Sequence, residues 1–153
     1  MVRLDPVNAQ LLLQIYELRR EEKLRRAREW LIANFWAENL EEFAIVCTPG
    51  SDENAYYRMV TTYWEMVASI VNHGMLDEEL HFENNGEGLL VWLRVKSVTL
   101  QMREARKNPL ILRHLETLAE KHTKWFETKA PGALEETLKA LETMRQKPEP
   151  LER

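Results

Sequence analysis

The sequence is poor in the residues that make tight turns and cross-links. Its 153 residues include five glycines, six prolines and one cysteine, Cys47. So little turn-forming material argues against an all-β fold, which needs many short connections. A lone cysteine excludes a disulfide within the chain and favours a reducing compartment.

Long hydrophobic runs and a secretory signal are also missing. The apolar run Leu11–Leu13, with Ile15 and Tyr16 close behind, is far shorter than the roughly 20 residues of a membrane-spanning helix. The first ten residues lack the charged segment and long apolar core of a signal peptide. We therefore expect a cytoplasmic protein without a membrane span.

Positive charge is in slight deficit. The net charge is −4, which argues against a dedicated nucleic-acid binder, because such proteins gain most of their affinity from neutralising phosphates. Between Glu38 and Glu87, Arg58 is the only lysine or arginine. The composition, 44% hydrophobic and 30% charged, is ordinary for a globular protein of one domain.

What the sequence does contain is helical periodicity, clearest over residues 54–73. The apolar residues there recur at steps of three and four, which places them on one side of a helix. The arc is broad, so this helix needs neighbours on several sides and is expected at the centre of a bundle. Its members are Tyr56, Met59, Val60, Tyr63, Val67, Ile70 and Val71.

Start signals for further helices follow along the chain. Asn39 and Ser51 can cap, and Asn108 followed by Pro109 predicts another start. The run Leu89–Met102 is ambiguous, because its β-branched content would also suit a strand; we interpret it as part of a helix over residues 86–106. The pattern predicts an all-α, single-domain irregular bundle of five to six helices over residues 1–146, with a mobile tail at 147–153.

The N-terminal helix is expected to be long, from about Asn8 to Asn34, and its apolar side changes halfway. Leu11, Ile15 and Leu18 lie on one side, whereas Leu24 and Leu31 lie nearly opposite. Such a helix touches two different bodies. The first half packs either on another helix of the chain or on a second subunit, and we favour a homodimer with Leu11, Ile15 and Leu18 at its interface.

The middle of that helix carries a mixed run of charges, Arg19–Arg28. A basic helix of this kind can bind RNA, but acidic residues alternate with the basic ones here. Glu21 with Arg25, and Glu22 with Arg26, have the spacing of helix-stabilising pairs. No aromatic residue interleaves the arginines to stack on bases. A solvated helix face is the preferred interpretation.

Residues that could carry chemistry are few. Glu78-x-x-His81 has the step used in di-metal helical bundles, but such sites need a second motif of the same kind, so no metal or other cofactor is expected. His122 lies on an apolar arc and is interpreted as an interior residue. Cys47 has acidic neighbours, which do not activate a thiol. We predict no catalytic residues and no enzymatic activity.

One polar line remains as a candidate ligand site. Arg58, Thr62 and Glu65 follow each other at helical spacing on the predicted central helix. If another helix covers this side, Arg58 needs a carboxylate or an anionic ligand. If nothing covers it, the line is simply the wet side of the helix.

Three blocks of sequence resemble an uncharacterised bacterial all-α family of unknown function. They are YELRREEKLRRAREW, NAYYRMVTTYWEMVASIVNHGMLDEELHFENNGE and NPLILRHLETLAE, in this order. The resemblance covers about Ala9 to Leu141 and implies a helical fold, but no activity and no functional residues.

These observations lead to a ranked set of functional hypotheses. The first is a non-enzymatic helical interaction or scaffold module that self-associates. The alternative is a small-ligand-binding or regulatory domain that uses the polar side around Arg58. RNA binding through Arg19–Arg28 is less favoured.

Overall fold

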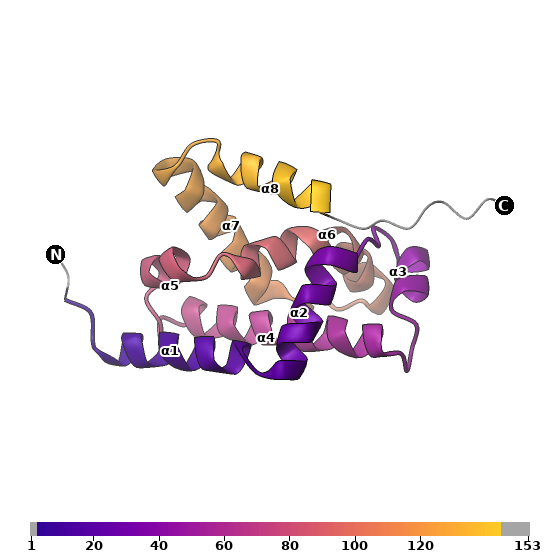
Figure 1. Ribbon diagram of the computed structural model, residues 1–153, viewed down its shortest axis with the longest axis horizontal. Coiled ribbons are helices and arrows are strands. Elements are labelled where there is room, and N and C mark those ends of the chain that lie inside the picture. The colour runs from indigo at the N-terminus through magenta and orange to yellow at the C-terminus, as the bar shows by residue number, and fades with distance from the viewer. Residues whose placement is uncertain (1–2, 145–153) are drawn as a thin grey trace.

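The computed structural model describes residues 3–144, and in this part of the chain it contains eight α-helices (Figure 1). The all-α prediction is therefore confirmed, whereas the expected five to six helices were too few. The predicted tail at 147–153 lies outside the described residues. The helices are α1 (Val7–Arg19), α2 (Glu22–Asn34), α3 (Leu40–Val46), α4 (Asp52–Asn72), α5 (Glu78–Asn84), α6 (Glu87–Arg106), α7 (Arg113–Lys129) and α8 (Ala133–Met144).

The prediction of one long N-terminal helix is wrong, because the chain breaks at Arg20 and Glu21. Glu21 has an extended ψ of 137°, and its carboxylate accepts a hydrogen bond from the Leu24 backbone N–H at 2.9 Å. This contact caps α2 and defines its start. The elbow lets both apolar stripes face the same core, with Ile15 and Leu31 both buried. The change of sides therefore coincides with a bend, and the first half of the predicted helix packs on α4 of the same chain.

Helix α4 lies at the centre of the fold, as its broad apolar arc predicts. It packs against α2, α5, α6 and α7. Val60 and Val67 are completely buried, and Trp64 is 1% exposed. Ser51 caps the helix through a 3.1 Å hydrogen bond from the Asn54 N–H, as expected from the sequence.

The ambiguous segment Leu89–Met102 is helical, as part of α6. Its residues at steps of three and four, Val91, Val95 and Val98, are completely buried. The β-branched content is accommodated because these side chains fill the core between α4 and α7. Left-handed Lys107, with φ of 50°, ends the helix.

Two elements occupy opposite edges of the view in Figure 1. Helix α1 lies beside α4 at the lower edge, and α8 lies at the upper edge, above α6. A hydrogen bond from the Tyr63 hydroxyl of α4 to the Ile15 carbonyl confirms that α1 and α4 are neighbours. The two peripheral helices are therefore separate surfaces of one bundle.

Candidate functional site

Exposed apolar side chains concentrate on α1 and the residues just before it. Of the twelve large hydrophobic residues that are exposed in the described part of the chain, five lie between Leu4 and Leu18. Val7, Leu11, Gln14 and Leu18 follow each other at steps of four, three and four, so they line up along one side of the helix. We call these four residues the α1 strip. Val7 is 50% and Leu18 54% exposed, Gln14 is exposed, and Leu11 is half-buried and packs against the core.

Polar contacts determine which side of α1 faces outward. Near its start, the Asn8 side-chain oxygen accepts a hydrogen bond from the backbone N–H of Asp77 at 2.8 Å. Near its end, the Tyr63 hydroxyl of α4 donates to the Ile15 carbonyl. These anchors hold the inner side of α1 against the bundle, and the strip remains beside it at the surface.

The three predicted interface residues do not share one outer surface. Leu11 and Leu18 belong to the α1 strip, but Ile15 is 5% exposed and packs into the core of its own chain. Ile15 is therefore left out of the α1 strip, and the interface role of the three residues stays a prediction. Leu13 and Tyr16 are exposed on another side of α1, and sequence reasoning did not separate these sides.

The predicted ligand-binding residues lie in line on α4 but do not converge. Arg58 is exposed, and its Nε donates to the Asn54 side-chain oxygen at 3.0 Å. The Thr62 hydroxyl, also exposed, donates back to the Arg58 carbonyl. Glu65 is half-buried and has its partners on another helix. Ligand binding by the three residues stays a prediction. Arg58 and Thr62 lie on the solvent-exposed side of α4.

Glu65 has a structural contact that the sequence did not reveal. Its two carboxylate oxygens accept hydrogen bonds from the backbone N–H groups of His114, at 2.9 Å, and Leu115, at 2.8 Å. These are among the first N–H groups of α7, which have no partner inside their own helix. Leu112 precedes them in a left-handed conformation and offers no side-chain cap. Glu65 therefore caps α7 from α4.

A second hidden contact joins the elbow to α6. Arg28 donates from Nε and Nη2 to the two carboxylate oxygens of Glu87, at 2.6 Å each, and from Nη1 to the Arg19 carbonyl at 3.0 Å. The indole N–H of Trp64 also donates to Glu87, at 3.2 Å. Burial opposes the charge of Arg28, but the hydrogen bonds to Glu87 outweigh it and raise the pKa of Arg28. This network ties α1, α2, α4 and α6 together.

The rest of the basic run has a local explanation. Arg26 pairs with Glu22 at 3.4 Å, as the spacing predicted, and Arg20 lies 4.0 Å from Glu17. The expected pairing of Glu21 with Arg25 gives way to the capping of α2 by Glu21. The charges of this segment therefore stabilise the helices on either side of the elbow.

Two histidines lie in the interior between α5 and α7. His81 and His122 are each 2% exposed, and burial lowers the pKa of both to about 4, with the charge of His122 adding to the effect on His81. His122 stacks between Phe82 and Phe126, with ring centroids 4.3 and 5.0 Å away. Glu78 instead pairs with Lys121 at the surface. The interior position predicted for His122 is confirmed.

The buried thiol lies at the end of α3. Cys47 is 1% exposed, and burial, helped by the charge of Glu53, raises the pKa of its thiol to about 12. The thiolate is the reactive form of cysteine. The geometry thus agrees with a packing role for Cys47. Among the described residues, no three histidine, cysteine or acidic side chains gather in a way that could hold a metal ion.

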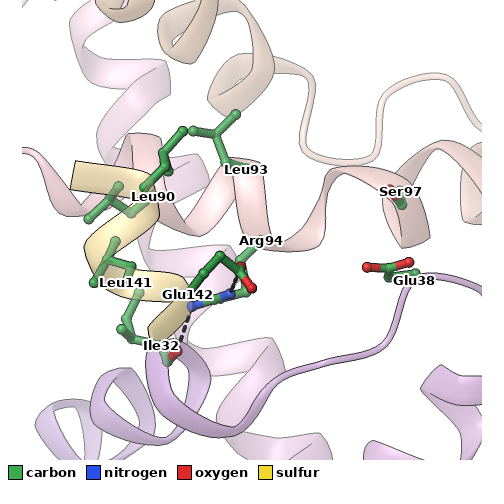
Figure 2. A pocket seen from close by; sticks show the side chains of 9 residues that line it. Ile32, Glu38, Leu90, Leu93, Arg94, Ser97, Leu141 and Glu142 are labelled. Atoms are coloured by element: carbon green, nitrogen blue, oxygen red, sulfur yellow. Dashed lines mark hydrogen bonds and ion pairs between the residues drawn. The ribbon is translucent and has the colours of Figure 1, made fainter. Parts of the chain in front are cut away.

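A cavity of about 360 Å³ lies where α8 crosses α6 and the end of α2 (Figure 2). Its wall on the bundle side also includes Glu38 and Ser97; we call the four residues Ile32, Leu90, Leu93 and Arg94 of this wall the α8 groove. Arg94 donates to the Ile32 carbonyl at 2.9 Å and to Glu142 of α8 at 3.1 Å. No sequence pattern had pointed to Arg94, because its partners are 62 and 48 residues away.

These features define an all-helical domain whose polar side chains cap and connect helices, and whose apolar side chains emerge on α1 and beneath α8. No helix of the described residues is both long enough and apolar enough to cross a membrane.

The family model described as "Domain of unknown function (DUF4760)" matches residues 6–125, and the chain belongs to this family. The resemblance to an uncharacterised family is thereby confirmed. Comparison with curated proteins finds no match, and comparison with solved structures finds none either.

Proposed function

We propose that this chain is a non-enzymatic interaction module that pairs with a second copy of itself through the α1 strip. The observation that carries the proposal is that Val7 and Leu18 are exposed along one side of α1, with half-buried Leu11 between them, while the inner side of the helix is anchored to the bundle. Contiguous apolar surface costs free energy in water, and its burial is the main driving force of association.

The spacing of the strip favours a second helix as the occupant. Steps of four and three residues form the seam of helix pairs. In an antiparallel pair centred between Leu11 and Gln14, Val7 of one copy would pack on Leu18 of the other. The two helix dipoles would then point in opposite directions, which is the favourable arrangement. Gln14 would be the one polar member of the seam, and a polar seam residue restricts register. A two-fold pair needs only this one surface.

The candidate catalytic groups support the non-enzymatic part of the proposal. Cys47 is buried with a protonated thiol, and His81 and His122 are enclosed by the core. An unpaired thiol is ordinary in a reducing compartment, so we place the module in the cytoplasm. The engagement of Arg28 and Arg26 with carboxylates favours a protein partner over RNA.

Light scattering coupled to size exclusion tests the proposal. We expect a dimer at tens of micromolar protein, and a monomer for Leu18→Glu and for Val7→Glu with unchanged helical circular dichroism. Ile45→Glu is the matched control, because Ile45 is 63% exposed and lies on α3, which Figure 1 shows at the other end of the bundle from α1. A monomeric wild type, or a Leu18→Glu protein that still dimerises, would overturn the proposal.

A further inference from the structure

Helix α8 buries little of its surface against the rest of the bundle. None of its twelve residues is buried, and its apolar residues Leu134, Leu138 and Leu141 are only half-buried. It follows Pro131 and Gly132, and Gly132 has a φ of 84°, which favours glycine. A second cavity, of about 260 Å³, lies near the start of α8 beside Phe126. The helix thus rests between two cavities instead of filling the space.

The surface beneath α8 comes from α6 and the end of α2. Leu90 and Leu93 of α6 line the same cavity as Leu141 of α8 (Figure 2); Leu90 is half-buried and Leu93 is 37% exposed. The Arg94 side chain is 9% exposed, whereas the Glu142 side chain that meets it is 61% exposed. The groove side of this contact is therefore largely buried, and the α8 side is largely exposed.

The segment that the family model matches includes the groove residues but not α8. All four residues of the α8 groove fall within the matched segment 6–125, whereas α8 begins at Ala133, beyond it. The groove residues therefore lie within the segment that the family model matches, and α8 lies outside it.

We propose that the α8 groove is a docking site for an amphipathic helix of a partner protein, and that α8 occupies it in cis. The partner helix carries leucines at the spacing of Leu134, Leu138 and Leu141, and a carboxylate that pairs with Arg94. Docking of an amphipathic helix into an apolar groove is a common recognition mode, in which leucines at such steps act as anchors.

Charge complementarity specifies the occupant further. Arg94 is held in place by its bond to the Ile32 carbonyl. A largely buried guanidinium favours a carboxylate partner, because an unpaired buried charge is costly. Glu142 supplies this carboxylate from α8. A partner helix without an acidic residue at the matching position would bind less well.

Because α8 is tethered, it competes at a high effective concentration. A partner in trans therefore binds weakly until α8 leaves the groove. Neither α8 nor the α8 groove includes a residue of α1, so this inference does not depend on the proposed self-association.

The test uses the full chain and a fluorescent peptide with the α8 sequence, ALEETLKALETM, followed by anisotropy. Leu138→Asp with Leu141→Asp in cis releases α8 and should tighten peptide binding by about tenfold or more relative to wild type. Adding Arg94→Gln to this background should remove the gain. Lys139→Gln is the matched control, because Lys139 is exposed on α8 and glutamine keeps the helix propensity without adding a like charge, so binding should stay at the wild-type level.

Glu142→Lys provides a second, milder release, since it changes only an exposed side chain that faces Arg94. It should also tighten binding, by a smaller factor. Unchanged peptide binding in both released proteins would overturn the proposal, as would equal binding after Arg94→Gln. If the wild type instead forms dimers that Leu18→Glu leaves intact and Leu141→Asp abolishes, the occupant is α8 of a second copy, and the partner proposal fails.

Discussion

Arg28 and Glu87 lie 59 residues apart in the sequence and form a two-pronged ion pair with both N–O distances at 2.6 Å. Their side chains are 16% and 18% exposed. Arg28 lies in the middle of α2, and Glu87 is the first residue of α6, where a negative charge also complements the helix dipole. The pair therefore joins α2 to the start of α6.

We predict that Arg28→Met destabilises the protein by about 2–3 kcal/mol. The substitution leaves the Glu87 carboxylate largely buried, with the Trp64 indole as a remaining donor. Arg26→Met is the matched control, because Arg26 and its partner Glu22 are 63% and 76% exposed, and exposed pairs contribute at most about 0.5 kcal/mol. Urea unfolding measures both. Equal losses for the two variants would contradict the prediction.

Glu65→Gln is expected to lower the free energy of unfolding by about 1 kcal/mol, the usual contribution of a helix cap. The amide can accept one of the two hydrogen bonds from α7 but carries no charge for its dipole. Thr62→Ala, three residues earlier on the exposed side of α4, serves as control and should change stability by less than about 0.5 kcal/mol. Urea unfolding measures both losses, provided that the free energy of unfolding depends on urea concentration with the same slope in all the proteins compared. A loss no larger than that of Thr62→Ala would show that the cap is not needed.

The same residue shows where local sequence reasoning ends. Asn108 and Pro109 predicted the start of a helix, yet the Asn108 side chain caps only a turn, by accepting from the Leu110 N–H at 3.0 Å, and α7 begins at Arg113. The real start depends on Glu65, which approaches from another helix. A cap supplied by tertiary structure leaves no signal in the neighbouring sequence.

Features that depend on one helix were predictable. The broad apolar arc placed α4 at the centre, and the caps at Asn39 and Ser51 are present. The elbow was harder, because Glu21 looks like an ordinary member of a charged helix. Only the switch of apolar sides indicated that something changes there, and either a bend or a second body could explain it. The α8 groove, which joins Ile32 to Leu90, depends entirely on packing.

Gly88→Ala should destabilise the protein by about 1–2 kcal/mol, although alanine is the better helix former. A Cβ atom at this position would lie 3.1 Å from Cε3 and 3.4 Å from Cδ2 of Trp64. Trp64 is 1% exposed and its N–H is bonded to Glu87, so the ring has little room to retreat. The matched control is Gly86→Ala, where no atom lies within 4 Å of the added carbon. Thermal unfolding that ranks Gly88→Ala at or above the control would contradict this expectation.

Acid should destabilise the fold through His81 and His122. Both imidazoles stay neutral in the folded chain down to about pH 4, the value to which burial lowers each pKa. In the unfolded chain they take up protons below about pH 6.5. Between these values the unfolded state binds more protons, so stability falls as the pH falls, by up to about 1.4 kcal/mol per pH unit for each histidine.

The contribution of His122 can be isolated by replacing it with phenylalanine. Its Nε2 has no hydrogen-bond partner among the described residues, and the aromatic stack with Phe82 and Phe126 would be kept. We expect His122→Phe to reduce the loss of unfolding free energy between pH 6.5 and 5, whereas His73→Gln, at an exposed histidine, should keep the wild-type loss. Urea titrations at the two pH values give this difference directly. If His122→Phe and wild type lose the same free energy, His122 takes up no fewer protons in the folded chain than in the unfolded one, and the acid sensitivity must come from His81 or from other groups.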